Sequence, residues 1–106
     1  MKNKNEILGA SGVNTRLAHL GNEPFDFFGF VNPPIARGST VLFPDAATLM
    51  SGDQPYTYGT HGTPTTDALC KMIDELEGSA GTILLSSGLA AVTVPFLAYL
   101  SAGEHA

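Results

Sequence analysis

Residues 88–101 carry no charged side chain, and they are apolar on nearly every side of the helix that they predict. A helix of this kind must be covered all round by other parts of a fold. The segment is long enough for a helix but shorter than a membrane span. Because a chain of 106 residues has little else to cover it, we expect the sequence to be a truncated piece of a larger domain.

The junction in front of this helix is the second informative feature. Residues 80–85 predict a short buried strand, and Ser86, Ser87 and Gly88 come next. A helix that begins at such a turn leaves several backbone N–H groups without intrahelical partners, at the positive end of its dipole. These donors suit an anion such as a phosphate. An ordinary capped strand-to-helix turn is the alternative that the local sequence leaves open.

The clearest upstream helix covers residues 65–77. An apolar stripe recurs there at helical spacing, formed by Leu69, Met72, Ile73 and Leu76. The opposite face carries three charged residues at spacings of four that allow weak ion pairs: Asp67, Lys71 and Glu75. Thr63 can cap this helix, Pro64 suits its first turn, and Gly78 would end it.

Two shorter helices are expected nearer the N-terminus. Asn14 is the expected cap of a helix over residues 15–20, which Gly21 would end. A second helix would begin near Ala46 and end at Gly52.

The segments between these helices are expected to be extended or irregular. Residues 39–43 predict a short strand, and residues 54–64, rich in Gly, Pro and Thr, predict a loop. Residues 21–37 are punctuated by Gly and Pro and rich in phenylalanine. So many aromatic side chains on irregular backbone need a surface to pack against. This segment is therefore either an arm that lies on a partner chain or a loop folded over the domain's own core.

Charge and composition exclude several classes of function. The net charge is −5 and no basic cluster extends beyond Lys2 and Lys4, so nucleic-acid binding has no electrostatic support. The single cysteine, Cys70, suits a reducing compartment, and no apolar core follows the charged N-terminus. We therefore expect a cytoplasmic protein without a membrane partner. The histidines lack ligand spacing, so no metal site is expected: His19, His61 and His105.

Four motifs then occur in a characteristic order: Pro33-Pro34-Ile35, residues 58–65, Glu75-Leu76-Glu77-Gly78 and residues 86–91. Together they make the chain, from about Thr15 onward, similar to the start of the Cys/Met-metabolism pyridoxal-phosphate (PLP) enzymes. The resemblance implies an α/β fold, the N-terminal portion of a fold-type-I, aminotransferase-like enzyme. Residues 1–57 would be an extended N-terminal arm and oligomerisation segment, and residues 58–106 the start of the large, here truncated, PLP-binding domain.

The resemblance also implies a cofactor site. Gly88 and Leu89 would supply backbone N–H groups to the phosphate of pyridoxal 5'-phosphate, with Ser87 at the rim. Tyr58 would reach the phosphate of a neighbouring subunit in a homotetramer built from tight dimers. The family usually carries an arginine two residues after this tyrosine, where this chain has Thr60. Since threonine brings no charge, the contact in trans should be weaker or supplied differently.

No catalytic residue is expected within this sequence. PLP chemistry needs a Schiff-base lysine, an acid at the pyridine nitrogen and a ring stacked on the cofactor. The resemblance places all three beyond the matched part of such enzymes. Lys2 and Lys4 lie in a polar tail and Lys71 on the outer face of a helix, so the 106-residue chain alone should be inactive.

The expected activity of the complete enzyme is that of a carbon–sulfur lyase of the cystathionine β-lyase type. It would convert a small sulfur amino acid, cystathionine, to homocysteine, pyruvate and ammonia. Gly62 supports this choice, because the γ-synthases and γ-lyases usually carry Asn there. Cystathionine γ-synthase, methionine γ-lyase or a sulfhydrylase of the same family remains an alternative. A non-catalytic module that binds a partner chain is the alternative from another class.

Overall fold

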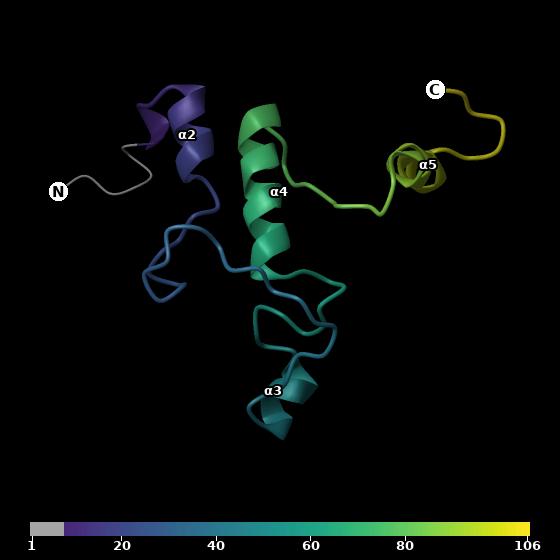
Figure 1. The fold of residues 1–106 in the computed structure, drawn as a ribbon. Coiled ribbons are helices and arrows are strands. Elements are labelled where there is room, and N and C mark those ends of the chain that lie inside the picture. Colours follow the sequence, from purple (N-terminus) through teal and green to yellow (C-terminus); the bar gives the residue numbers. More distant parts are fainter. Residues whose placement is uncertain (1–7) are drawn as a thin grey trace.

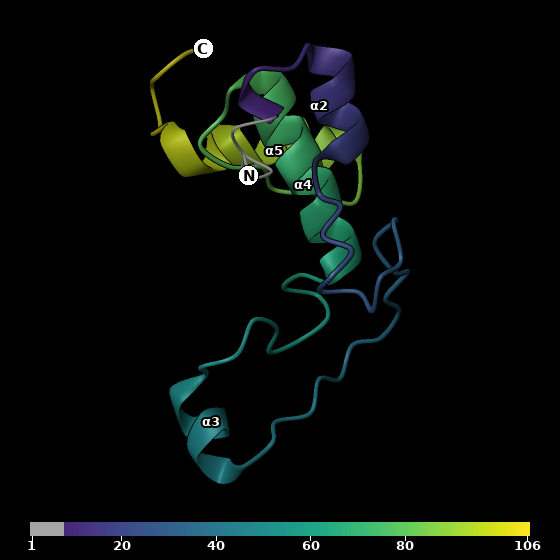
Figure 2. The same cartoon turned by 90° about the vertical axis from the view of Figure 1, so that its left-hand side faces the viewer.

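The computed structural model describes residues 8–106, so Lys2 and Lys4 lie outside the described residues. Four helices fall wholly within this range: α2 (Val13–His19), α3 (Ala46–Ser51), α4 (Pro64–Glu77) and α5 (Gly88–Tyr99). Helix α2 packs against α4, as both Figure 1 and Figure 2 show. Helix α3 lies at the far end of a long loop, and α5 stands apart beyond an extended segment (Figure 1).

Helix α4 has both of its predicted ends. The Thr63 hydroxyl accepts the N–H of Thr66 at 3.2 Å, and the Thr66 hydroxyl accepts the N–H of Thr63 at 2.8 Å. This reciprocal capping box satisfies donors that a helix start leaves free. Pro64 occupies the first turn, and Gly78 ends the helix in the left-handed conformation at φ 63°. The predicted helix over residues 65–77 is therefore confirmed.

The first turn of α4 also ties down a segment distant in sequence. The Thr65 hydroxyl donates to the carbonyl of Pro34 at 2.6 Å and accepts the N–H of Ala36 at 2.8 Å. One side chain thus satisfies a donor and an acceptor of an extended stretch that has no helix or sheet of its own.

Helix α2 lies along α4 and differs from its prediction at the start. It begins at Val13 after Gly12, with no side-chain cap, so Asn14 lies inside the helix and the predicted Asn14 cap is wrong. Arg16 of α2 pairs with Glu75 of α4, so Glu75 finds its partner across helices. The chain then passes close to α4: a Cβ at Gly21 would lie 2.6 Å from the Ala68 carbonyl oxygen.

Helices α3 and α5 begin where the sequence predicts. Asp45 caps α3 by accepting the Thr48 N–H at 2.8 Å, and this hydrogen bond lowers the pKa of its carboxyl group. Gly52 ends α3 at φ 68°. Helix α5 continues through Pro95 but stops at Tyr99, two residues before the predicted end, because Leu100 is already extended.

The two predicted strands do not form a sheet within the described residues. Residues 39–43 contribute one antiparallel bridge, between Thr40 and Tyr58, with the Gly59 N–H donating to the Ser39 carbonyl at 2.8 Å. Residues 81–85 are extended without a paired neighbour. A strand exists only where another backbone lies alongside to share its hydrogen bonds. The expected α/β architecture is therefore not confirmed by this structure.

The described chain buries very little apolar surface. Leu8 and Ala68 are its buried apolar residues, whereas Phe25 and Phe28 are 97% and 98% exposed. Its accessible surface is 8497 Å², against about 5,700 Å² for a compact monomer of this mass. The radius of gyration is 17.5 Å, against about 13 Å for a compact domain of this length. The expected all-round cover of α5 is thus absent from the described part of the chain.

None of the described helices, α5 included, combines the length and apolar character that crossing a bilayer requires.

Gly59, next to the bridge at Tyr58, lies too close to the opposite segment to carry a side chain. A Cβ at Gly59 would lie 1.9 Å from the carbonyl oxygen of Gly38, so Gly59→Ala must separate the two segments. In the protein encoded by the complete reading frame, we expect a loss of about 1–3 kcal/mol in the free energy of unfolding, measured by denaturant titration. Gly38→Ala is the matched control, because nothing lies within 4 Å of its Cβ position. Equal stability of the two variants would contradict the close approach.

Candidate anion-binding site

The start of α5 is a locally capped turn. Ser87 is extended, at φ −158° and ψ 158°. Its hydroxyl accepts the N–H of Ala90 at 3.1 Å, and its carbonyl accepts the N–H of Ala91 at 3.0 Å. Serine is among the residues that favour this position, because its short side chain reaches the third helical N–H. The turn predicted from residues 86–88 is therefore formed by contacts within the same few residues.

Two backbone donors remain open at this turn. The N–H groups of Gly88 and Leu89 are the first two of the helix and have no carbonyl one turn back. The hydrogen bonds of the described residues include no acceptor for either of them. Nothing lies within 4 Å of the Cβ position of Gly88, and the Leu89 side chain is 78% exposed. An anion can therefore approach both donors.

Ser87 can supply a third hydrogen bond. A hydroxyl group has one donor and two acceptor positions, and capping Ala90 uses only an acceptor position. Three donors around an open approach, at the positive end of a helix, fit a phosphate group. The residues at the start of α5 thus fit the phosphate of pyridoxal phosphate.

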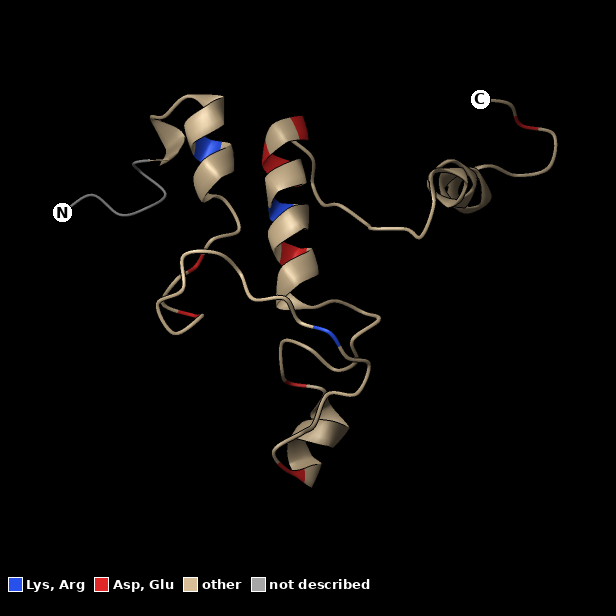
Figure 3. Cartoon of the chain, viewed as in Figure 1, with Lys and Arg blue, Asp and Glu red and all other residues tan. Residues whose placement is uncertain are grey.

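No side-chain charge supports these donors from α5 itself. Figure 3 shows the charged residues on the other segments, and α5 contains none. A doubly charged phosphate held by dipoles alone is less stable than one that also meets a charged group. Any charged partner must therefore come from another part of the structure.

Tyr58 lies in the loop between α3 and α4. Its backbone is held by the bridge to Thr40, and its carbonyl accepts the N–H of His61 at 2.9 Å. Its ring is 44% exposed and meets the His61 ring edge-on, with centroids 5.8 Å apart. No partner occurs for its hydroxyl among residues 8–106. The backbone is thus fixed while the hydroxyl is free to meet a ligand.

The structure does not bring Tyr58 and the start of α5 together within one chain. The loop after α3 lies at the N-terminal end of α4, whereas α5 follows its C-terminal end (Figures 1 and 2). The four predicted site residues therefore form two groups: Tyr58 alone, and Ser87 with Gly88 and Leu89. Thr60 lies in the Tyr58 loop.

Asp74, a carboxylate that the sequence patterns did not single out, anchors the segment leading to α5. Asp74 of α4 accepts the hydroxyl of Thr82 at 2.6 Å and that of Ser79 at 2.7 Å. These two hydrogen bonds lower the pKa of Asp74, the one from Thr82 more strongly. In the sequence, Asp74 resembles any other polar residue of an amphipathic helix. The only sequence signal for this contact is the pair of hydroxyl residues that follow Gly78, Ser79 and Thr82.

A cavity of about 360 Å³ separates the Tyr58 loop from residues 82–84, and Asp67 and Cys70 line it. Burial, and then the nearby Asp67 and Asp74 carboxylates, raise the pKa of the Cys70 thiol. A thiol that stays protonated is a poor nucleophile. Among the described residues, no group of His, Cys, Asp and Glu side chains is arranged to hold a metal ion.

Comparison with known proteins places these features in a family. The sequence pattern of the Cys/Met metabolism PLP-dependent enzymes matches residues 14–106. A Rhizobium johnstonii protein with the provisional name cystathionine beta-lyase is 63% identical over 106 residues, covering 100% of this chain and 27% of that protein. A cystathionine beta-lyase of Bordetella avium is 42% identical over 107 residues, covering 92% and 27%. An L-alanine/L-glutamate racemase of Wolbachia pipientis wMel is 33% identical over 103 residues, covering 84% and 26%.

The chain spans about a quarter of the length of these relatives. The matched residues include both the Tyr58 loop and the open N–H groups at the start of α5. The names of the relatives cover more than one reaction, but all of them align with most of this chain. This chain belongs to the Cys/Met metabolism PLP-dependent enzyme family.

Proposed function

We propose that this chain forms the phosphate-binding part of a PLP-dependent carbon–sulfur lyase of the cystathionine β-lyase type. The reaction would convert cystathionine and water to homocysteine, pyruvate and ammonia. The observation that carries the proposal is the pair of open N–H groups at Gly88 and Leu89, in a chain of a PLP-dependent family. The names of the Rhizobium and Bordetella relatives support this reaction.

When bound, pyridoxal phosphate draws electrons from the α-carbon of the substrate and so favours loss of sulfur from the β-carbon. The role of this chain is to bind and orient the cofactor. Gly88, Leu89 and the Ser87 hydroxyl would hold three phosphate oxygens and so fix the position of the ring. Lys71 lies on an exposed face of α4, so covalent attachment and proton transfer would belong to residues outside 1–106.

The proposed site is shared between two subunits. Since Tyr58 and α5 lie apart in one chain, the Tyr58 hydroxyl would reach the phosphate held by a second subunit. The complete enzyme would be a cytoplasmic homotetramer of tight dimers, with residues 1–57 as the oligomerisation arm and residues 58–106 as the start of the PLP-binding domain. The exposed Phe25 and Phe28 give such an arm apolar surface to bury.

Product analysis tests the reaction. The protein encoded by the complete reading frame, incubated with PLP and cystathionine, should release pyruvate and homocysteine in equal amounts. Release of cysteine and a four-carbon keto acid would indicate a γ-lyase instead. Net synthesis of cystathionine or homocysteine from an activated homoserine would indicate a γ-synthase or a sulfhydrylase. A stable protein that neither binds PLP nor turns over these substrates would favour the non-catalytic module.

Gly88→Pro tests the open donors. Proline is tolerated at the first position of a helix and removes only its N–H. Ser87 already has the extended conformation that a following proline requires. We expect the dissociation constant of PLP to rise about tenfold or more, because a hydrogen bond to a charged group is lost. The measurement is a titration of the apoprotein with PLP, followed by absorbance.

Gly88→Ala is the matched control, since it keeps the N–H and meets no atom within 4 Å. It should bind PLP as the unchanged protein does. Equal affinities of the proline and alanine variants would exclude the Gly88 N–H as a phosphate donor.

Subunit mixing tests the contact in trans. Tyr58→Phe should weaken PLP binding, whereas Tyr99→Phe, at an 85% exposed tyrosine, should not. When Tyr58→Phe subunits are mixed with Gly88→Pro subunits, a mixed dimer has one site with both defects and one site with neither. A fraction of sites should therefore recover the original affinity. If Tyr58 acts within its own chain, mixing will restore none.

A further inference from the structure

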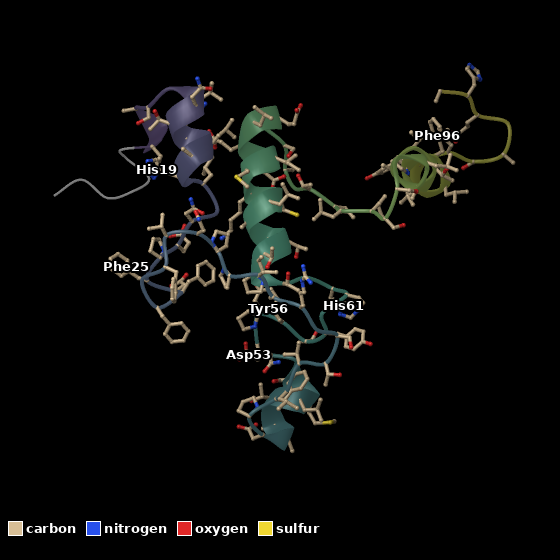
Figure 4. The ribbon with its side chains drawn as sticks, viewed as in Figure 1. His19, Phe25, Asp53, Tyr56, His61 and Phe96 are labelled. Carbon is tan, nitrogen blue, oxygen red and sulfur yellow. The ribbon has the colours of Figure 1, made fainter. Side chains whose placement is uncertain are left out.

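Tyr56 and Asp67 form a contact that the proposed site does not use. The Tyr56 hydroxyl, in the loop after α3, donates to Oδ2 of Asp67, in the first turn of α4, at 2.8 Å. Both residues are half-buried. Figure 4 shows Tyr56 directly below the start of α4, on the same loop as His61. The contact therefore joins the loop that carries Tyr58 to the longest helix.

The far end of the same loop also lies against this pair. At Gly62, where φ is 154°, a Cβ would lie 3.4 Å from Oδ1 of Asp67 and 4.0 Å from the Tyr56 ring. The carbonyl of Tyr56 accepts the side-chain amide of Gln54 at 2.6 Å. Residues 56–62 thus start and end beside one carboxylate, with Tyr58 between the two ends.

The two tyrosines of this loop have different roles in these contacts. The Tyr56 hydroxyl is occupied by Asp67, whereas the Tyr58 hydroxyl has no partner among the described residues. Burial, and then the hydrogen bond to Asp67, raise the pKa of Tyr56 to about 12. Tyr56 therefore remains a protonated donor at neutral pH, and its bond to Asp67 persists there.

We propose that Asp67 and Tyr56 are positioning residues: their hydrogen bond holds residues 56–62 in the conformation that presents the Tyr58 hydroxyl to a cofactor phosphate. The inference rests on the proposed role of Tyr58. Neither positioning residue touches the phosphate. Removing their contact leaves the Tyr58 side chain itself unchanged, but the loop should then sample more conformations. Phosphate binding would have to restrict the loop again, and this lowers the affinity.

A double-mutant cycle on the apoprotein encoded by the complete reading frame tests this inference. Tyr56→Phe removes one oxygen and keeps the ring. It should raise the dissociation constant of PLP about five- to tenfold, as expected for loss of one supporting hydrogen bond. In a Tyr58→Phe background the same change should have no further effect, because coupled residues are not additive. Asp67→Asn keeps an acceptor oxygen and should stay close to the original affinity, whereas Asp67→Ala should resemble Tyr56→Phe.

Hydrogen exchange of the apoprotein gives a readout that needs no cofactor. The amides of residues 57–62 should exchange faster in Tyr56→Phe and Asp67→Ala, and those of the C-terminal half of α4 should not change. If Tyr58→Phe weakens PLP binding but Tyr56→Phe does not, the positioning role is overturned and the proposed function stands. Additive effects of the two substitutions would also overturn it. If Tyr58→Phe has no effect, both the role of Tyr58 and this inference fail.

Discussion

The hydrogen bonds at the first turn of α4 hold two distant non-helical segments, residues 34–36 and the loop at Tyr56, against this helix. A helix start presents free N–H groups, and here Thr63 and Thr66 satisfy two of them while Thr65 and Asp67 bind other segments. With so little buried apolar surface in the described chain, these polar contacts decide where residues 34–36 and 54–62 lie. The loop that carries Tyr58 therefore depends on side chains from one helical turn.

The two candidate phosphate-binding groups share one design. At the start of α5, the Ser87 cap fixes the turn and leaves the next two N–H groups open. In the Tyr58 loop, backbone bonds and the neighbouring Tyr56 fix the chain and leave the Tyr58 hydroxyl open. The Gly88 and Leu89 N–H groups and the Tyr58 hydroxyl, which would meet a ligand, are not themselves the groups that hold the conformation. Such preorganisation lowers the entropy that binding must overcome.

The partners of several α4 side chains could not be predicted from the sequence. Asp67, Lys71 and Glu75 sit at spacings that predict ion pairs along one helix face, yet Asp67 accepts from Tyr56 and Glu75 pairs with Arg16 of another helix. The spacing gives the face on which a side chain lies but not the segment that reaches it. The predicted Asn14 cap is wrong for a related reason. Several neighbouring residues could begin this helix, and the path of the backbone starts it at Val13, after Gly12.

By itself, the sequence determined the helices, most of their ends and the turn before α5, because caps and helical hydrogen bonds join residues at most a few positions apart. It also determined the family, because the order and spacing of the motifs can be recognised without knowledge of the fold. The tertiary structure decided that residues 39–43 make one bridge rather than a strand, that no other described strand lies alongside residues 81–85, and that Tyr56 binds Asp67. These depend on segments far apart in sequence meeting in space, which no local pattern encodes.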